Sequence, residues 1–329
     1  MSKSLCRICG TPLRRSFVDL GKMPLSNAFR TPDLQDEPEV HYPLHTKVCE
    51  FCFLVQVGEV ASPETLFREY PYFSSYSSSW LAHAAEFAKE SIRVLGLGSA
   101  SLVVEIASND GYLLKNFHNA GIQVLGIEPA HNVARVAKAA SIPTVEEFFD
   151  LDLARKLAKE KGKADLLVAN NVLAHVPNLI NFTAGLKELL KPGGVLSLEF
   201  PHLLKLMEEL QFDTIYHEHF CYFSLWTVER LLGKQGLKVY DARNLKTHGG
   251  SLRLYAGHPE DGREETARVC EIRELESSAG IDRIDCYAGF ADRVRRLKRE
   301  LLTLLISIKE DGKSVVAYGA PAKGTILLN

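Results

Sequence analysis

The stretch from Val103 to Leu114 constrains the fold of this chain more than any other feature. It begins with an apolar run typical of a buried strand, continues into a polar turn with one glycine, and returns to apolar residues typical of a helix start. This order places backbone N–H groups at the carboxyl end of a parallel strand, where α/β sheets bind nucleotides. A second apolar run ends in Glu128, which follows Glu105 at close to the ~20-residue offset of an acid that binds a ribose hydroxyl pair.

The composition of this turn indicates which nucleotide it binds. A dinucleotide fold requires G-x-G-x-x-G, because a pyrophosphate must approach bare backbone, and the turn here offers only Gly111. The pattern Glu105-x-Ala107-x-Asn109-x-Gly111 resembles the E/D-x-G-x-G-x-G loop of class I methyltransferases, with Ala107 and Asn109 at the first two glycine positions. We therefore interpret the ligand as S-adenosylmethionine. For this loop taken alone, an ordinary strand–helix turn capped by Asn109 and Asp110 is an equally good reading.

Length and charge bound the class of protein. A chain of 329 residues favours about two domains, or three if one is small. The formal net charge of -2 gives no sign of the basic surface that nucleic-acid binding requires. No apolar run reaches the ~18 residues of a membrane span. The N-terminus lacks the apolar centre of a signal peptide, so a cytoplasmic location is the simplest expectation.

Four of the seven cysteines form two C-x-x-C pairs, Cys6/Cys9 and Cys49/Cys52, in a Pro-rich first unit. Each pair can direct two thiolates to one point, and two pairs complete a tetrahedral Zn²⁺ site. Four thiolates leave no open coordination position, so the zinc should be structural, and a unit this small needs such support. Two unrelated cysteine pairs are the weaker alternative, and a redox role is disfavoured because neither pair sits at a strand–helix junction.

A doubly wound α/β unit is expected in the middle of the chain. Apolar runs predict strands at 102–106, 124–128, 143–145, 165–170 and 194–200, with helical segments between them, which indicates a parallel sheet. Runs at 237–245 and 251–255 predict a further antiparallel pair. Before the sheet, Ser62 and Pro63 predict a helix start, and the aromatic segment 70–80 either lines a pocket or packs as a loop.

The C-terminal part is predicted to be helical and then to begin a new α/β unit. Residues 262–310 are charged, with an apolar stripe that we expect to pack against a neighbouring domain. Residues 314–324 predict a strand, a Gly-rich turn and a helix start, which cannot bury their own faces. A C-terminal α/β domain that is cut short, or completed by a partner, is therefore expected. The predicted domains are 1–62, 63–260 and 261–329.

The segment Tyr216-His217-Glu218-His219 indicates chemistry. It does not match the zinc signature H-E-x-x-H, because the two histidines cannot share one helical face. General acid–base work fits better: histidine titrates near neutrality, Glu218 can orient a histidine and raise its pKa, and Tyr216 can donate to a developing oxyanion. A surface loop without chemistry is the alternative, but the position after the fifth strand, at the ligand end of the sheet, favours function.

Collinear motifs over nearly the whole chain resemble those of the sugar C-methyltransferase family. They are the four cysteines and the segments 105–114, 126–129, 170–176, 216–220, 247–253 and 318–324. Members of this family methylate C-3 of dTDP-4-keto deoxysugars. The resemblance implies a zinc-binding N-terminal domain, a class I methyltransferase domain with a Rossmann-like sheet that binds S-adenosylmethionine, and a C-terminal α/β domain that helps to hold the nucleotide sugar and is partial in this chain.

The resemblance also implies roles for individual residues. His219 would be the base that removes the proton next to the ketone, Tyr216 and Glu218 would position it and the substrate, and His175 would lie near the transferred methyl group. The implied cofactor residues are Ala107, Ser108, Asn109, Gly111, Tyr112, Leu113, Glu128, Pro129, Phe148, Asn170 and Asn171. The implied substrate residues are Tyr70, Tyr222, His248, Gly249, Arg253 and Lys323.

Two other functions remain open from the sequence. The first is an NAD-dependent nucleotide-sugar oxidoreductase or epimerase, against which the single glycine of the first loop argues. The second is a non-catalytic zinc-ribbon interaction protein, against which the intact Tyr216, Glu218 and His219 argue. The identity of the deoxysugar and the oligomeric state are not determined by the sequence, and a monomer is the simplest expectation.

Overall fold

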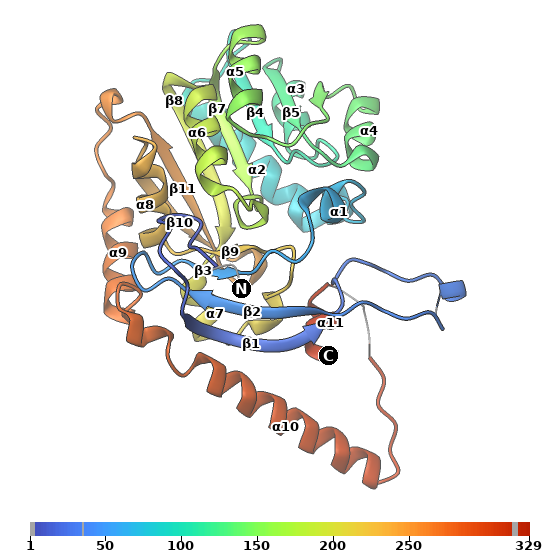
Figure 1. Cartoon of the computed structure of the whole chain (residues 1–329). Coiled ribbons are helices and arrows are strands. Elements are labelled where there is room, and N and C mark those ends of the chain that lie inside the picture. The colour runs from blue at the N-terminus through green and yellow to red at the C-terminus, as the bar shows by residue number, and fades with distance from the viewer. Residues whose placement is uncertain (1–3, 35, 318–321) are drawn as a thin grey trace.

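A seven-stranded sheet forms the centre of the computed structural model, which describes residues 4–34, 36–317 and 322–329 (Figure 1). Its strand order within the described residues is β10-β11-β8-β7-β4-β5-β6. The strands are β4 (Leu102–Ile106), β5 (Gln123–Ile127), β6 (Thr144–Val145), β7 (Ala164–Asn170), β8 (Leu190–Pro201), β10 (Lys238–Leu245) and β11 (Ser251–Gly257). All seven lie where the sequence predicted strands, with ends that differ by a few residues.

The pairing directions confirm the predicted class I methyltransferase sheet. Strands β6, β5, β4, β7 and β8 pair in parallel, whereas β11 pairs antiparallel with both β8 and β10. The strand order reverses at β4, because β5 lies on one side of it and β7 on the other. In open α/β sheets the crevice at such a reversal is where ligands bind, at the carboxyl ends of the strands.

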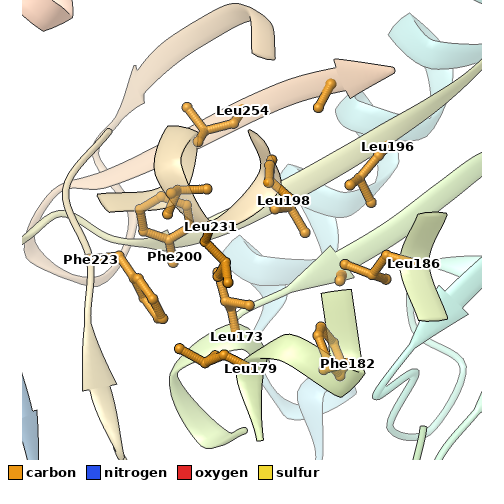
Figure 2. Close-up of a cluster of buried hydrophobic side chains, with 14 of the residues drawn as sticks. Leu173, Leu179, Phe182, Leu186, Leu196, Leu198, Phe200, Phe223, Leu231 and Leu254 are labelled. Atoms are coloured by element: carbon orange, nitrogen blue, oxygen red, sulfur yellow. The ribbon is translucent and has the colours of Figure 1, made fainter. Parts of the chain in front are cut away.

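Both faces of the parallel strands are buried, which explains why they read as continuous apolar runs. Alternate residues such as Val103 and Leu166 pack under α2 (Ser78–Leu95), α3 (Leu114–Asn119) and α4 (His131–Ala139). Their neighbours Val104 and Leu167 pack under α5 (Leu151–Glu160), α6 (Leu179–Leu189) and α8 (Leu225–Lys234). Figure 2 shows the second layer, where Phe200 and leucines of β8 meet side chains of α6 and α8. Each such buried side chain contributes about 1.5–3 kcal/mol.

Side-chain caps mark the start of some of the helices that connect the strands. Ser62 accepts a hydrogen bond from the Thr65 N–H at the start of α1, as predicted. Ser77, Asp150, Asn178 and Ser224 cap α2, α5, α6 and α8 in the same way, whereas α3, α4, α7, α9 and α10 begin without a side-chain cap. The structure describes eleven α-helices. They are α1 (Pro63–Phe67), α2 (Ser78–Leu95), α3 (Leu114–Asn119), α4 (His131–Ala139), α5 (Leu151–Glu160), α6 (Leu179–Leu189), α7 (Leu203–Glu208), α8 (Leu225–Lys234), α9 (Ala267–Ala279), α10 (Phe290–Glu310) and α11 (Ala322–Leu328).

A second sheet joins the N-terminal unit to a distant segment of the chain. Its order is β1 (Arg15–Met23), β2 (Tyr42–Val48), β3 (Val55–Val57) and β9 (Cys221–Tyr222). Strand β9 comes directly after the segment that suggested acid–base chemistry, and it pairs antiparallel with β3. The sequence did not predict this pairing, because the two segments lie far apart in the chain and β9 is very short. The predicted domain boundaries stay a prediction.

The C-terminal helices differ from the sequence-based expectation in two respects. The apolar stripe of α10 does not pack against a neighbouring domain, because Val294 is buried but Leu297 and Leu305 are exposed, and the helix extends away from both sheets (Figure 1). Residues 314–317 form no strand, and no strand of the described residues pairs with them. The Gly-rich turn at 318–321 lies outside the described residues, and α11 confirms the expected helix start. Among the described residues, no helix has the length and apolarity needed to cross a bilayer.

Candidate active site

The four cysteines of the N-terminal unit converge on one point. Their Sγ atoms all lie within 4.8 Å of one another, with 3.4 Å between Cys6 and Cys52 and 3.4 Å between Cys9 and Cys49. Tetrahedral zinc with Zn–S bonds of about 2.3 Å needs sulfur atoms at roughly this separation. Hydrogen bonds from the neighbouring thiols lower the pKa of Cys6, which favours the thiolate that a metal binds. The set fits the predicted structural zinc.

The predicted cofactor loop has a glycine-like backbone even where glycine is absent. Ala107, Asn109 and Gly111 follow β4 with φ angles of 55°, 50° and 79°. Two non-glycine residues in the left-handed region are held there by the surrounding structure, a strain that concentrates at ligand sites. The loop therefore keeps the shape of the glycine-rich pattern that it resembles.

The aromatic segment 70–80 lies over this loop. The Ser74 N–H donates to Asn109 Oδ1 (2.9 Å), and Asn109 Nδ2 donates to the Tyr72 carbonyl (3.1 Å). Asp110 Oδ2 accepts from the N–H and the hydroxyl of Ser75 (3.0 and 2.5 Å). The side chain of Asn109 is thus engaged with the segment, so a cofactor would meet its backbone rather than its amide.

Glu128 lies directly after β5, the strand next to β4. Its carboxylate accepts from the N–H groups of Asn109 (2.9 Å) and Ala130 (2.8 Å), and burial raises its pKa to about 7. The strand below it approaches the loop closely, because a Cβ on Gly126 would lie 2.4 Å from Ser108 Oγ. Glycine at this position lets Ser108 and Glu128 reach the same crevice.

Several buried oxygen atoms at these strand ends have no hydrogen-bond partner within the part of the chain that the structure describes. They belong to Ser108, Asp110, Asn170 and Asn171. Buried polar atoms are nearly always paired in folded proteins, so a bound molecule rich in donors fits here. The ammonium and ribose hydroxyls of S-adenosylmethionine are such donors.

Other predicted cofactor residues take supporting places. Leu113 and Tyr112 belong to the core under α2 and α3, so Leu113 can offer only its backbone. Pro129 is half-buried directly after Glu128. Phe148 lies under the Arg68 guanidinium, 5.5 Å from the ring centroid, beside a cleft of about 450 Å³.

His219 has one of its two ring nitrogens fixed by the backbone. Its Nδ1 lies 2.8 Å from the Thr214 carbonyl, and because a carbonyl only accepts, Nδ1 carries the proton. The other nitrogen, Nε2, then has a free lone pair. Burial, followed by the neighbouring His175, lowers the pKa of His219 well below the usual histidine range. This imidazole is therefore neutral at physiological pH and suited to accept a proton.

His175, after β7, lies against His219. The two ring centroids are 4.8 Å apart at 65°, and His175 Nδ1 donates to the Glu218 carbonyl (3.0 Å). Burial lowers the pKa of His175 to about 4. The structure thus brings together the two histidines that the sequence placed on different strand ends.

Glu218 does not act on His219 as we predicted. Its carboxylate accepts two hydrogen bonds from Asn27 Nδ2 (2.7 and 2.9 Å), and the pKa of His219 is lowered rather than raised. The Thr214 carbonyl orients the histidine instead. His217 points to the N-terminal unit, with Nε2 3.3 Å from the Pro43 carbonyl.

Three tyrosines border the histidines. The Tyr216 ring centroid lies 4.0 Å from that of His219, and the Tyr222 centroid lies 6.2 Å from it. Burial raises the pKa of Tyr216 and Tyr222 well above the usual range. Burial also raises the pKa of Tyr70, and the nearby negative charges of Glu218 and Glu128 raise it further. All three hydroxyls are therefore protonated and can donate.

Cationic and aromatic groups lie on the other side of His219. Lys323 in α11 and His248 both contribute to the low pKa of His219, which places them nearby. His248 has φ 52° and packs edge-on against Trp80, with centroids 5.1 Å apart. The carbonyl of Gly249 accepts from Gln211 Nε2 (2.7 Å).

Arg253 differs from its predicted role in substrate binding. It is 4% exposed, and its Nε and one terminal nitrogen donate to Glu199 (3.1 and 2.5 Å). His83 lies 2.8 Å from the same terminal nitrogen, and the guanidinium packs over Phe87. The ion pair joins β11 to β8, so the guanidinium of Arg253 binds another residue of the protein and not the substrate.

Sequence reasoning missed Asn27, Trp80, His83 and Glu199. Glu199 ends a strand run in an acidic residue, as Glu105 does, so the pattern contained a usable signal for it. Asn27 has no local signal, because its only distinguishing feature is a contact with a distant segment.

Family models match successive parts of the chain. A zinc binding domain matches residues 6–67, a methyltransferase domain matches residues 78–242, and a C-methyltransferase C-terminal domain matches residues 246–329. The ranges coincide with the cysteine cluster, the seven-stranded sheet and the segment that ends in α11.

Individual proteins are similar to the chain over different lengths. C-methyltransferase NovU of Streptomyces niveus is 35% identical over 323 residues, which cover 98% of this chain and 77% of NovU. Among solved structures, the PH0226 protein of Pyrococcus horikoshii OT3 has a TM-score of 0.46 at 16% identity, covering 57% of this chain and 96% of that one. Magnesium protoporphyrin IX methyltransferase of Synechocystis PCC 6803, with bound SAH, has a TM-score of 0.42 at 18% identity, covering 54% and 83%.

Proposed function

The chain belongs to the C-methyltransferase family, and on that premise we propose that it methylates C-3 of a dTDP-linked 4-keto deoxysugar. It is an S-adenosylmethionine-dependent enzyme with a structural zinc site. The proposal concerns the substrate, the position that is methylated and the residues that do the work.

One observation carries the proposal: a neutral imidazole, His219, with its proton held on Nδ1 by the Thr214 carbonyl. The hydrogen next to a ketone is acidic because the resulting carbanion is delocalised as an enolate. A neutral histidine held in place is a suitable general base for that hydrogen.

Each side chain has its own role in proton removal and enolate stabilisation. His219 Nε2 accepts the proton from the carbon next to the ketone, and the Tyr216 hydroxyl donates to the developing enolate oxygen. His175 packs against the base and keeps its ring in place. When bound, S-adenosylmethionine supplies the electrophilic methyl group that the enolate carbon takes. Holding both ligands in one crevice accounts for much of the expected rate.

The cofactor residues are proposed from their places at the strand ends. Glu128 would accept hydrogen bonds from the ribose hydroxyls, and the side-chain oxygens of Asn170 and Asn171, which have no partner among the described residues, would complete the crevice. Backbone groups of Ala107, Ser108, Asn109, Gly111 and Leu113 would meet the methionine part.

A nucleotide sugar is proposed from the cationic side of the site. Lys323 lies beside His219 and can attract a diphosphate through its charge, whereas burial lowers the pKa of His248, so this imidazole would serve as a neutral hydrogen-bonding group. Tyr70, Tyr222 and Gly249 border the space for the sugar. We reassign Arg253 from the substrate to the wall of the site, because Glu199 already holds it.

Calorimetric titration with S-adenosylhomocysteine, with NAD⁺ as the parallel control, tests the cofactor part. Transfer of a labelled methyl group to a dTDP-4-keto-6-deoxysugar, with the product position read by NMR, tests the substrate part. Binding of NAD⁺ alone would contradict the methyltransferase mechanism, and a product methylated on oxygen or nitrogen would contradict the role of His219.

A further inference from the structure

The N-terminal unit holds one side chain of the catalytic segment, which we define as residues 216–219. Asn27, in the connection between β1 and β2, donates through Nδ2 to both carboxylate oxygens of Glu218, at 2.7 and 2.9 Å. Glu218 is 2% exposed, so water cannot replace these hydrogen bonds freely. The contact crosses from the zinc-binding unit into the proposed active site.

The same unit also contacts His217 and the residues that follow the catalytic segment. His217 contacts the Pro43 carbonyl, the Val57 N–H donates to the Phe220 carbonyl (2.9 Å), and β9 pairs with β3. These contacts fix the backbone on both sides of Glu218. Asn27 differs from them because it donates to both oxygens of a buried carboxylate.

We propose that Asn27 is a positioning residue that keeps the Glu218 carboxylate ionised and directed toward the substrate. The proposal rests on the methyl transfer proposed above. An ionised carboxylate can accept a hydrogen bond from a sugar hydroxyl and so align the sugar with His219. A protonated carboxyl group would present one donor in place of an acceptor.

The surroundings of Glu218 show why a neutral amide is needed. Burial raises the pKa of Glu218 to about 7, and the hydrogen bonds from Asn27 lower it. Tyr70 and Tyr216 face the carboxylate but stay uncharged, because burial raises their pKa. His175, which bonds to the Glu218 carbonyl, and the adjacent His219 have lowered pKa values and are neutral at pH 7. Among these groups, Asn27 is therefore the one that favours the ionised form of Glu218.

The test compares kcat/KM as a function of pH in wild type, Asn27→Asp, Asn27→Ala and the matched control Asn244→Asp. Asn244 is exposed on β10, so its change adds the same charge away from the site. Two carboxylates in contact cannot both ionise, so Asn27→Asp should move the ascending limb near pH 7 upward by about one unit or more. At pH 7 the ionised fraction of Glu218 should fall from about one half to about one tenth for a shift of one unit, so the rate should fall about fivefold or more and recover at higher pH.

Further variants separate positioning from folding. Asn27→Ala should shift the limb in the same direction by a smaller amount, and the shift should disappear when Glu218→Gln is present in the background. Affinity for S-adenosylhomocysteine should stay unchanged in all of them. Folded Asn27 variants with the wild-type pH profile would overturn the proposal.

A measurement without turnover distinguishes this proposal from the proposed function. The ¹³C NMR shift of the Glu218 carboxyl group reports its titration directly. If wild type transfers no methyl group to the nucleotide sugar, the proposed function fails. A Glu218 titration that Asn27→Asp does not move would overturn the positioning role in either case.

Discussion

Replacement of His219 by asparagine tests the proposed base without removing its anchor. The asparagine amide can occupy the place of the Nδ1 edge and donate to the Thr214 carbonyl, which accepts at 2.8 Å in the wild type. It offers no basic nitrogen at the position of Nε2. The variant therefore keeps the local hydrogen bond and loses only the group that accepts the proton.

The expected loss follows from the state of the wild-type ring. Because burial and the neighbouring His175 lower the pKa of His219 well below the usual range, the ring is neutral at pH 7 and Nε2 is free to accept a proton. A positioned general base contributes about 10²–10⁴ in rate, or about 2.7–5.5 kcal/mol of transition-state stabilisation. We expect a loss of that size in proton abstraction.

The assay is exchange of the hydrogen next to the ketone with deuterium from D₂O, followed by proton NMR in the presence of S-adenosylhomocysteine. This isolates proton removal from methyl transfer. His217→Asn is the matched control, since the same residue type two positions earlier faces the Pro43 carbonyl. Exchange at the wild-type rate in the His219 variant, or an equal loss in the His217 variant, would refute the assignment.

Three further predictions concern the cofactor loop, the metal and the buried ion pair. Gly126→Ala brings a Cβ to 2.4 Å from Ser108 Oγ, so it should lower stability by about 1–3 kcal/mol and weaken S-adenosylhomocysteine binding. The control Gly98→Ala, whose Cβ would meet nothing within 4 Å, should change neither stability nor binding. Thermal denaturation measures the first effect and calorimetry the second. Cys49→Ser should abolish zinc binding and lower the melting temperature, as metal analysis and denaturation would show, and an unchanged melting temperature would contradict a structural metal. Arg253→Met should destabilise the fold by about 3–5 kcal/mol, because the buried Glu199 carboxylate loses its partner. If Arg253 bound the substrate instead, its replacement would raise KM and leave stability unchanged.

Local patterns were sufficient to predict the elements of the large sheet. Each strand is an apolar run bounded by polar turn residues, and both faces are covered, so burial and strand length are encoded together. The two C-x-x-C pairs likewise predicted their own convergence, because metal geometry permits few alternatives. The loop after β4 was recognisable despite Ala107 and Asn109, since its spacing was intact.

The small sheet and the C-terminal part show the limit of such patterns. Strand β9 is too short to register as a strand, and it exists because β3 offers it a partner. Residues 314–317 have the composition of a strand but form none, and within the described residues no strand pairs with them. Strand formation there depends on pairing between distant segments rather than on propensity.

The sequence by itself determined the sheet and the cysteine set that fits zinc, and it indicated the side chains that we propose to react. The tertiary structure decided their states: His219 is neutral with a fixed tautomer, Glu218 is held by Asn27, and Arg253 is committed to Glu199. The physical reason is that residue type and spacing encode periodicity and ligand chemistry, whereas charge state and hydrogen-bond partners depend on burial and on contacts between remote segments.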